Sequence, residues 1–164
     1  MTTVFLLLGS NLGDRPATLR RAVDLLQTQV GNVKKTSGLY ETAPWGNTDQ
    51  PAFLNQAVEL STELPPLELL KTTQSIEEAL GRVRREKWGA RVIDIDLLFF
   101  GTEILDFSDL KIPHPYLPER RFALAPLAEL APEFVHPGLR KTVSALLAEC
   151  VDGSEVKRIG MLSR

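Results

Sequence analysis

Two aspartates, Asp94 and Asp96, are separated by a single isoleucine inside an otherwise apolar run. In a β-strand, residues i and i+2 point to the same face, so a strand here would place both carboxylates on one side, about 7 Å apart. Two like charges at that spacing on a half-buried sheet repel unless a positive charge lies between them. Mg²⁺ carrying phosphates is the commonest cation held by carboxylate oxygens in this way. The spacing therefore indicates a site for a metal and a polyphosphate.

A basic segment lies directly upstream of these aspartates. Residues 82–91 contain five basic side chains and a tryptophan, namely Arg82, Arg84, Arg85, Lys87, Trp88 and Arg91. A solvated charged loop is the ordinary interpretation of such a segment. Its position beside two carboxylates favours phosphoryl transfer, in which acids hold the metal and guanidinium groups stabilise the charge that develops on the phosphates.

A second candidate site follows from the segment Phe53–Thr62, which has the composition of a strand. Alternation places Phe53 and Asn55 on one face. A flat ring beside an amide suits a flat heteroaromatic ligand, because the ring stacks and the amide contacts an edge that carries donors and acceptors. The residues alone favour the plainer alternative, a core phenylalanine beside an asparagine that bonds to a turn.

Other polar residues have two interpretations each. Gln74 and Glu77 are i, i+3 neighbours near the end of a predicted helix, and they either face the basic segment or form a solvated helix face. His114 lies between prolines, and it can contact phosphate only if its turn folds back beside the aspartates. His136, in a proline-containing connection, is expected at the surface.

Composition limits the classes of protein that fit. The chain has 164 residues, 43% hydrophobic and 24% charged, with a net charge of −2. This balance argues against a general nucleic-acid or membrane-surface binder. The lone Cys150 excludes an internal disulfide, and no leader or apolar span is evident, so we expect a cytoplasmic protein.

The predicted elements form one α+β domain over residues 1–164. Strands are expected at 4–8, 33–41, Phe53–Thr62 and around the aspartates. One helix is capped by Asp14 and ends at Gly31, and another opens at Pro65 and ends at Gly81. Further helices are expected over 119–130, interrupted at Pro126, and from Thr142 to Cys150. The order β, α, β, β, α, β is that of a ferredoxin-like sandwich, a mostly antiparallel sheet with helices packed on it.

Several motifs together resemble a known family, the 6-hydroxymethyl-7,8-dihydropterin pyrophosphokinases of folate biosynthesis. The matching pieces are LGSNLGD at 8–14, YET at 40–42, DQPAFLNQAV at 49–58, GRVR at 81–84, WGARVIDIDLLFFG at 88–101, IPHP at 112–115 and ERRFALAPLAELAP at 119–132. The resemblance implies transfer of the β,γ-diphosphate of ATP to the pterin hydroxymethyl group, with release of AMP. It also implies that the protein acts as a monomer on ATP and the pterin, without nucleic acid or membrane.

The resemblance implies roles for individual residues. Asp94 and Asp96 match the ligands of two Mg²⁺ ions, and Arg82 and Arg91 match arginines that meet the phosphates during catalysis. The residues that match ATP contacts are Gln74, Glu77, Arg84, Trp88, Arg91, Leu97, His114 and Arg120. The residues that match pterin contacts are Thr42, Ala43, Trp45, Phe53, Asn55 and Phe122.

Two alternatives stand beside this interpretation. Ferredoxin-like domains include sheets that stack RNA bases on aromatic residues, but Phe53 lacks an aromatic-rich partner run and the net charge is unfavourable. An inactive relative that serves as a scaffold is the other alternative, and the complete set of acids and arginines argues against it.

Overall fold

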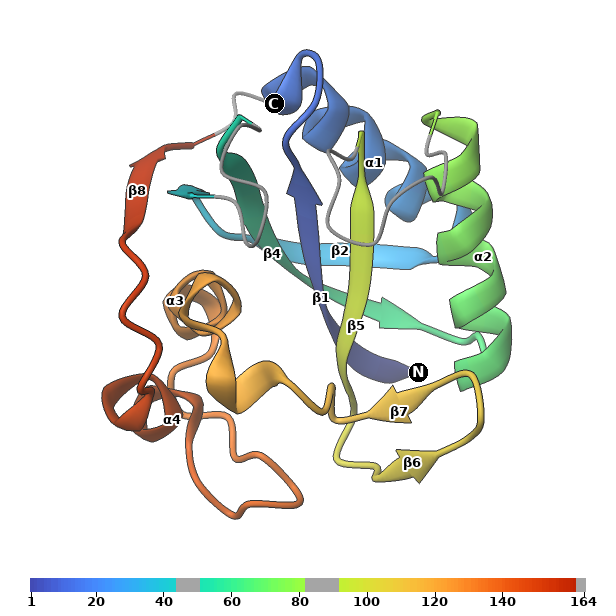
Figure 1. Cartoon of the computed structure of the whole chain (residues 1–164). Helices are drawn as coiled ribbons and strands as arrows, with labels where there is room; N and C mark the ends of the chain where they lie inside the picture. The colour runs from blue at the N-terminus through green and yellow to red at the C-terminus, as the bar shows by residue number, and fades with distance from the viewer. Residues whose placement is uncertain (44–50, 82–91, 162–164) are drawn as a thin grey trace.

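The computed structural model describes residues 1–43, 51–81 and 92–161. Within these residues, six strands form one antiparallel sheet in the order β5-β1-β4-β3-β8, and β2 also pairs with β4 (Figure 1). The strands are β1 (Thr2–Ser10), β2 (Gly31–Thr36), β3 (Leu39–Thr42), β4 (Phe53–Thr62), β5 (Asp94–Phe100) and β8 (Val156–Gly160). A separate small hairpin pairs β6 (Leu105–Asp106) with β7 (Lys111–Ile112).

Helices cover both faces of the sheet. Figure 1 shows α1 (Arg15–Gln29) and α2 (Pro66–Ala79) on one face, and α3 (Arg121–Leu130) and α4 (Val143–Glu149) on the other. A short 3₁₀ helix, Leu117–Glu119, precedes α3. The units β1-α1-β2 and β4-α2-β5 each enclose a strand of the other unit, which is the split βαβ arrangement. The predicted ferredoxin-like α+β fold is therefore confirmed.

The beginning of α1 follows from its sequence. The Asp14 side chain caps the helix by accepting a hydrogen bond from the Ala17 amide at 3.2 Å, and Pro16 lies in the first turn, where it removes no helical hydrogen bond. Its apolar residues recur at helical spacing and are buried against the sheet: Leu19, Ala22, Val23 and Leu26. Gly31 comes just after the cap residue Val30 and is already the first residue of β2.

The predicted single strand over 33–41 is wrong, because the structure divides it into β2 and β3. The break lies at Ser37, which is fully buried. The Ser37 hydroxyl donates to the Gly38 carbonyl at 2.8 Å and accepts from the Ala57 amide at 2.9 Å. A side chain thus replaces a backbone partner at this point, so that β2 and β3 pair with different ends of β4.

The two faces of the sheet carry separate hydrophobic cores. The larger core lies under α1 and α2, and it includes Leu6, Leu8 and Ile95. The second lies under α3 and α4, and it includes Leu7 and Phe99. A register shift in the pairing of β1 with β5 changes the alternation of β5, so that Leu98 and Phe99 both contribute to the second core.

Two further predictions need correction. The helix α3 continues through Pro126 instead of being interrupted there. His136 is buried and not on the surface: its Nδ1 accepts from the Gly138 and Leu139 amides at 3.1 and 2.9 Å. Its ring also stands edge-on to Phe99, with centroids 5.6 Å apart, so the turn that carries His136 closes over the second core. In the part of the chain that the structure describes, no helix is long and apolar enough to cross a membrane.

Candidate active site

Asp94 and Asp96 lie on the first half of β5, as the spacing predicts. Both are half-buried, whereas Ile95 between them is buried in the larger core. Asp94 pairs with Gly9 and Asp96 with Leu7, a residue of the second core, so both carboxylates lie on the face of the sheet that α3 covers. The buried Glu77 carboxylate of α2 accepts a hydrogen bond from the Ile95 amide at 2.7 Å and holds this part of β5 from its outer edge.

A row of residues runs across the sheet from Asp94. Asp94, Gly9, Asn55 and Tyr40 are successive cross-strand neighbours on β5, β1, β4 and β3. Asn55 is 4% exposed, and its Nδ2 donates to the Leu8 carbonyl at 3.2 Å. Its Oδ1 has no hydrogen-bond partner among the described residues. A buried acceptor without a partner costs free energy unless a ligand satisfies it, so Asn55 is suited to contact a bound molecule.

Phe53 and Thr42 lie one step further along the same face. They are cross-strand partners, Phe53 is half-buried, and the buried Thr42 hydroxyl also lacks a partner among the described residues. The backbone that leads into Phe53 is fixed by side chains. Asn11 donates to the Pro51 carbonyl at 3.2 Å, and Arg15 donates to the Ala52 carbonyl at 2.8 Å.

The Ile112–Pro113 turn returns His114 to β5. The His114 amide donates to the Leu98 carbonyl at 3.0 Å, two residues from Asp96, so the condition set for a phosphate contact at His114 is met. Burial, and next the positive charge of Arg120, lower the pKa of His114 from 6.5 to about 4. Its Nδ1 accepts from the Tyr116 amide at 3.2 Å, so the neutral ring carries its proton on Nε2 and can donate a hydrogen bond there.

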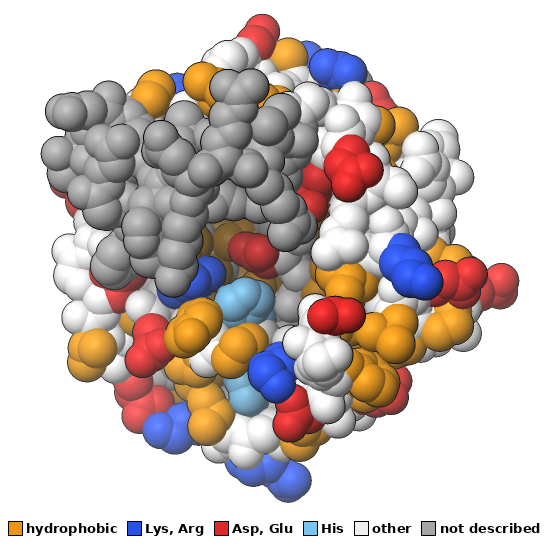
Figure 2. Space-filling view, turned by 45° about the vertical axis from the view of Figure 1, so that its right-hand side comes forward, with side chains coloured by type: hydrophobic (Ala, Val, Ile, Leu, Met, Phe, Trp, Pro, Cys, Tyr) orange, Lys and Arg blue, Asp and Glu red, His pale blue; other side chains and the backbone are white. Residues whose placement is uncertain are grey.

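Arg120 and Phe122 lie together at the start of α3. The Arg120 guanidinium lies over the Tyr116 ring at 5.2 Å and over the Phe122 ring at 5.6 Å. Figure 2 shows one face of the molecule on which acidic, basic and histidine side chains gather around a hollow. A cation, a neutral imidazole and two carboxylates are what a polyphosphate with its metal requires.

The structure distributes the remaining predicted residues differently. Ala43 follows β3 and is exposed, and Gln74 is half-buried on α2. Glu77 is buried, so its interpretation as part of a solvated helix face is wrong. Leu97 is 4% exposed in the larger core, on the face of β5 that α2 covers and opposite the aspartates, so its predicted ATP contact would lie on the side of Gln74 and Glu77. The predicted residues Trp45, Arg82, Arg84, Trp88 and Arg91 lie outside the described residues.

The donor set fits Mg²⁺ that arrives with a nucleotide. No cluster of three or more His, Cys, Asp or Glu side chains able to hold a metal occurs among residues 1–43, 51–81 and 92–161. The two carboxylates of Asp94 and Asp96 are of the kind that Mg²⁺ uses when substrate phosphates and water complete its shell.

Sequence patterns did not reveal several residues that shape this site. Asn11 and Arg15 belong to the turn and the first turn of α1, and their contacts with residues 51 and 52 depend on the folded sheet. Asp14 and Gly13 nearby carry the local signals of a helix start, but nothing in the local pattern indicates a long-range role for their neighbours.

Comparisons with known proteins agree on one family. The sequence pattern of 7,8-dihydro-6-hydroxymethylpterin-pyrophosphokinase (HPPK) matches residues 5–132. The chain is 48% identical over 161 residues to the Methylorubrum extorquens protein named 2-amino-4-hydroxy-6-hydroxymethyldihydropteridine pyrophosphokinase, covering 97% of this chain and 99% of that protein. It is 50% identical over 127 residues to the Bacillus subtilis protein of the same name, covering 77% of this chain and 76% of that one.

Solved structures show the same fold. The crystal structure of wild-type Plasmodium falciparum HPPK-DHPS matches with a TM-score of 0.72 and 19% identity, over 90% of this chain and 44% of that chain. A structure of HPPK-DHPS in complex with substrates matches with a TM-score of 0.72 and 18% identity, over 90% and 43%. The chain thus spans less than half the length of these HPPK-DHPS chains, and at this identity the likeness shows the fold.

Proposed function

The chain belongs to the 7,8-dihydro-6-hydroxymethylpterin-pyrophosphokinase family, and on this premise we propose which of its residues bind the pterin and which bind ATP and its metal. It is an ATP-dependent pyrophosphokinase of folate biosynthesis, which transfers diphosphate from ATP to the hydroxymethyl group of 6-hydroxymethyl-7,8-dihydropterin and releases AMP. The observation that supports this assignment of a pterin side and an ATP side is the row Asp94, Gly9, Asn55. It joins a carboxylate to a buried acceptor without a described partner, with only a glycine between them.

The pterin binds on the Asn55 side of the row. The Asn55 Oδ1 accepts hydrogen bonds from the N–H groups on the pterin edge, and the Thr42 segment completes that edge. Phe53 and Phe122 provide aromatic surfaces for the two faces of the ring. These roles rest on the burial of Asn55 and Thr42, on their oxygens that have no partner among the described residues, and on the family resemblance.

ATP and its metal bind on the Asp94 side. Asp94 and Asp96 hold Mg²⁺, two ions in our proposal, which neutralise the phosphates and lower the pKa of the attacking hydroxyl when bound. The neutral His114 donates from Nε2 to a phosphate oxygen, and Arg120 supplies positive charge beside it. Gln74 and Glu77 remain the predicted contacts of the nucleoside, and Leu97 keeps its predicted contact with ATP. Arg82, Arg84, Trp88 and Arg91 keep the ATP and phosphate roles, and Trp45 and Ala43 the pterin roles, that the resemblance implies.

These residues do most of their work by position and charge. The carboxylates and His114 orient the phosphates, and the row keeps the pterin hydroxymethyl group near them, so that attack on the β-phosphorus is close and aligned. We assign no described side chain the role of general base, because Mg²⁺ held by Asp94 and Asp96 would itself make the pterin hydroxyl more acidic.

An assay of AMP release tests the reaction to which these residue roles are assigned. The purified chain is incubated with ATP, Mg²⁺ and 6-hydroxymethyl-7,8-dihydropterin, and AMP and the pterin diphosphate are quantified. We expect equal amounts of the two products and no AMP when the pterin carries methyl in place of hydroxymethyl. ADP as the main product, or AMP that forms without the pterin, would contradict the proposal.

We also propose that residues 1–164 act as one domain and as a cytoplasmic monomer. The near-complete overlap with the Methylorubrum extorquens protein supports one domain. The sheet row and the start of α3 come from the same chain, so the described part of the site needs no second copy. Size-exclusion chromatography with light scattering at several concentrations tests the monomer, and a mass near twice 18.2 kDa would contradict it.

A further inference from the structure

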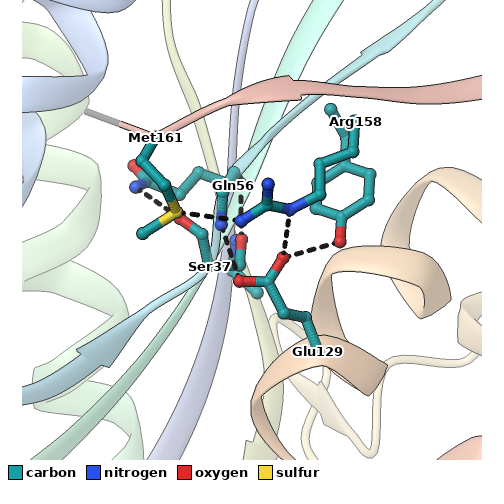
Figure 3. A network of polar contacts seen from close by, with 8 residues as sticks. Ser37, Gln56, Glu129, Arg158 and Met161 are labelled. Atoms are coloured by element: carbon teal, nitrogen blue, oxygen red, sulfur yellow. Dashed lines mark hydrogen bonds and ion pairs between the residues drawn. The ribbon is translucent and has the colours of Figure 1, made fainter.

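The C-terminal segment, defined here as residues 133–161, lies beyond the part of the chain that matches the family pattern. It forms α4 and β8, and it attaches to α3 at both ends of that helix. At the C-terminal end of α3, the Arg158 Nε donates to the Glu129 Oε1 at 3.0 Å, and Figure 3 shows these two side chains pointing toward one another. At the N-terminal end of α3, Cys150 and Asp152 contact Arg121.

The contact at the N-terminal end of α3 has more hydrogen bonds than the contact at its C-terminal end. Arg121 donates twice to Asp152: its amide to the Oδ2 at 3.1 Å and its Nε to the backbone carbonyl at 2.9 Å. The Arg121 Nη2 donates to the Cys150 carbonyl at 3.1 Å. The other carboxylate oxygen, Oδ1, accepts from the Ser154 amide at 2.9 Å and hydroxyl at 2.6 Å. Although burial opposes it, the hydrogen bonds from Ser154 and Arg121 lower the pKa of Asp152, so the carboxylate is charged at neutral pH.

This contact supplies what α3 lacks in its own sequence. The cap residue of α3 is Arg120, whose side chain makes no capping hydrogen bond. The first N–H groups of a helix have no partner inside the helix, and a carboxylate there satisfies them and interacts favourably with the helix dipole. Asp152 therefore caps α3 from 31 residues away in the sequence.

Arg121, the residue that Asp152 holds, lies between Arg120 and Phe122. These two neighbours contact each other through the guanidinium and the ring. They are also the residues to which the proposed function gives an ATP contact and a pterin contact. Fixing the backbone and side chain of Arg121 fixes the direction in which its neighbours leave the helix start.

We propose that Asp152 is a positioning residue for the transfer reaction: by capping α3 and holding Arg121, it sets Arg120 and Phe122 for ATP and the pterin. This inference rests on the proposed function, because it uses the roles given there to Arg120 and Phe122. The C-terminal segment lies outside the residues that match the family pattern, and the inference gives it a part in substrate binding.

The test compares Asp152→Ala and Asp152→Asn with the wild-type chain in steady-state kinetics, well below the unfolding temperature. We expect KM for ATP and for the pterin to rise about 3- to 10-fold in Asp152→Ala, the range that loss of a helix cap supports. Asp152→Asn keeps a side-chain oxygen for the Arg121 amide, so a smaller rise is expected, and it keeps the test valid if Asp152→Ala does not fold.

Two control variants separate positioning from general loosening. Glu149→Gln removes a carboxylate of the same segment that pairs with Lys141 at 2.9 Å, and KM should not change. Arg158→Gln removes the contact with Glu129 at the C-terminal end of α3, and it should lower the unfolding temperature with KM within about twofold of wild type. A merely structural role would reduce the active fraction and the apparent kcat while leaving KM unchanged.

Wild-type KM values in both Asp152 variants would overturn the inference, and so would equal rises in Asp152→Ala and Arg158→Gln. The proposed function fails separately, if the wild-type chain forms no AMP with the pterin. An active wild-type enzyme with unaffected Asp152 variants thus refutes only the role of Asp152.

Discussion

At the scale of single residues, Asp94 and Asp96 lie at one end of the row across the sheet. Their i, i+2 spacing fixes a common face of β5, and Ile95 between them is buried on the other face. This geometry requires nothing beyond the strand itself. Their use with Mg²⁺ and ATP is a proposal that substitution can test directly.

Asp96→Ala should reduce kcat roughly 10²–10³-fold, because it removes a carboxylate that stabilises charge in the transition state. Stability should stay close to wild type, since the half-buried Asp96 contributes to neither hydrophobic core. Asp24→Ala is the control, because it removes an exposed carboxylate from α1. Kinetics and urea unfolding of both variants provide the measurement, and near-wild-type turnover in Asp96→Ala would refute the metal assignment.

The lowered pKa of His114 predicts how the free energy of unfolding changes with pH. Its pKa is lowered from 6.5 to about 4, first by burial and then by Arg120. Between these values the unfolded chain binds a proton that the folded chain does not. The stability that the neutral His114 gives is therefore present above pH 6.5, and it is lost as the pH falls toward 4, by at most ~1.4 kcal/mol per pH unit.

His114→Gln should flatten this part of the stability profile. The free energy of unfolding, measured with urea from pH 4 to 7, should fall less steeply with acid in the variant than in the wild type. The slope is the informative quantity, because the substitution also alters the hydrogen bond to the Tyr116 amide. Identical slopes in the two proteins would show that His114 titrates normally in the folded state.

At the scale of elements, the close approach of β1 and β4 makes the pterin side of the row possible. A Cβ atom on Gly9 would lie 2.7 Å from the Asn55 Nδ2, so any side chain on Gly9 displaces the amide. The glycine is therefore required by its neighbour on the next strand. Its own backbone conformation imposes no such requirement.

Gly9→Ala should raise KM for the pterin about tenfold or more, as Asn55→Ala should, with a small effect on KM for ATP. The double variant should be no worse than Asn55→Ala, since both changes remove the same contact. Gly31→Ala is the matched control: its Cβ would lie 1.9 Å from the Ser61 carbonyl oxygen, so it should lower stability and leave KM unchanged. Additive effects of Gly9→Ala and Asn55→Ala would contradict this account.

The elements also show where prediction from sequence stops. Local signals suffice for α1, whose cap residue Asp14 and apolar period are contiguous. They fail at Ser37, because its hydroxyl breaks the strand only through a partner on β4. They fail again at β8, since Val156–Gly160 is a strand through its pairing with β3. In each case the deciding partner is distant in the sequence.

The site shows the same limit. Phe53 and Asn55 share a face by simple alternation, and the burial of the Asn55 acceptor without a described partner now favours the ligand-binding interpretation over the plainer one. Glu77 and Asp152 depend on contacts with Ile95 and Arg121, 18 and 31 residues away. No periodicity in the sequence records such pairs, because each partner lies on another element.

At the scale of the whole molecule, the apolar residues that pack the two cores are distinct from the polar residues proposed to act in the reaction. Two apolar clusters pack on opposite faces of one sheet. The side chains of Asp94, Asp96 and Asn55 lie on the face that α3 covers, whereas Gln74 and Glu77 come from α2 on the other face. In the proposed mechanism the metal arrives with ATP, and the fold does not depend on it. This separation predicts how the protein responds to a chelator and to nucleotide.

Removal of divalent cations should abolish turnover without changing the unfolding temperature of the ligand-free protein, because hydrophobic burial supplies the stability. ATP with Mg²⁺ at about a hundredfold excess over Kd should raise that temperature by roughly 5–10 °C, since a ligand stabilises the state that binds it. ATP with EDTA should give a much smaller shift. In Asp96→Ala, added Mg²⁺ should no longer increase the shift that ATP produces. An activity assay with and without EDTA measures turnover. Scanning calorimetry of the wild-type chain and of Asp96→Ala, each with and without ATP and with Mg²⁺ or EDTA, measures the unfolding temperatures. An EDTA-induced fall in the unfolding temperature of the ligand-free chain would mean that a metal belongs to the fold itself.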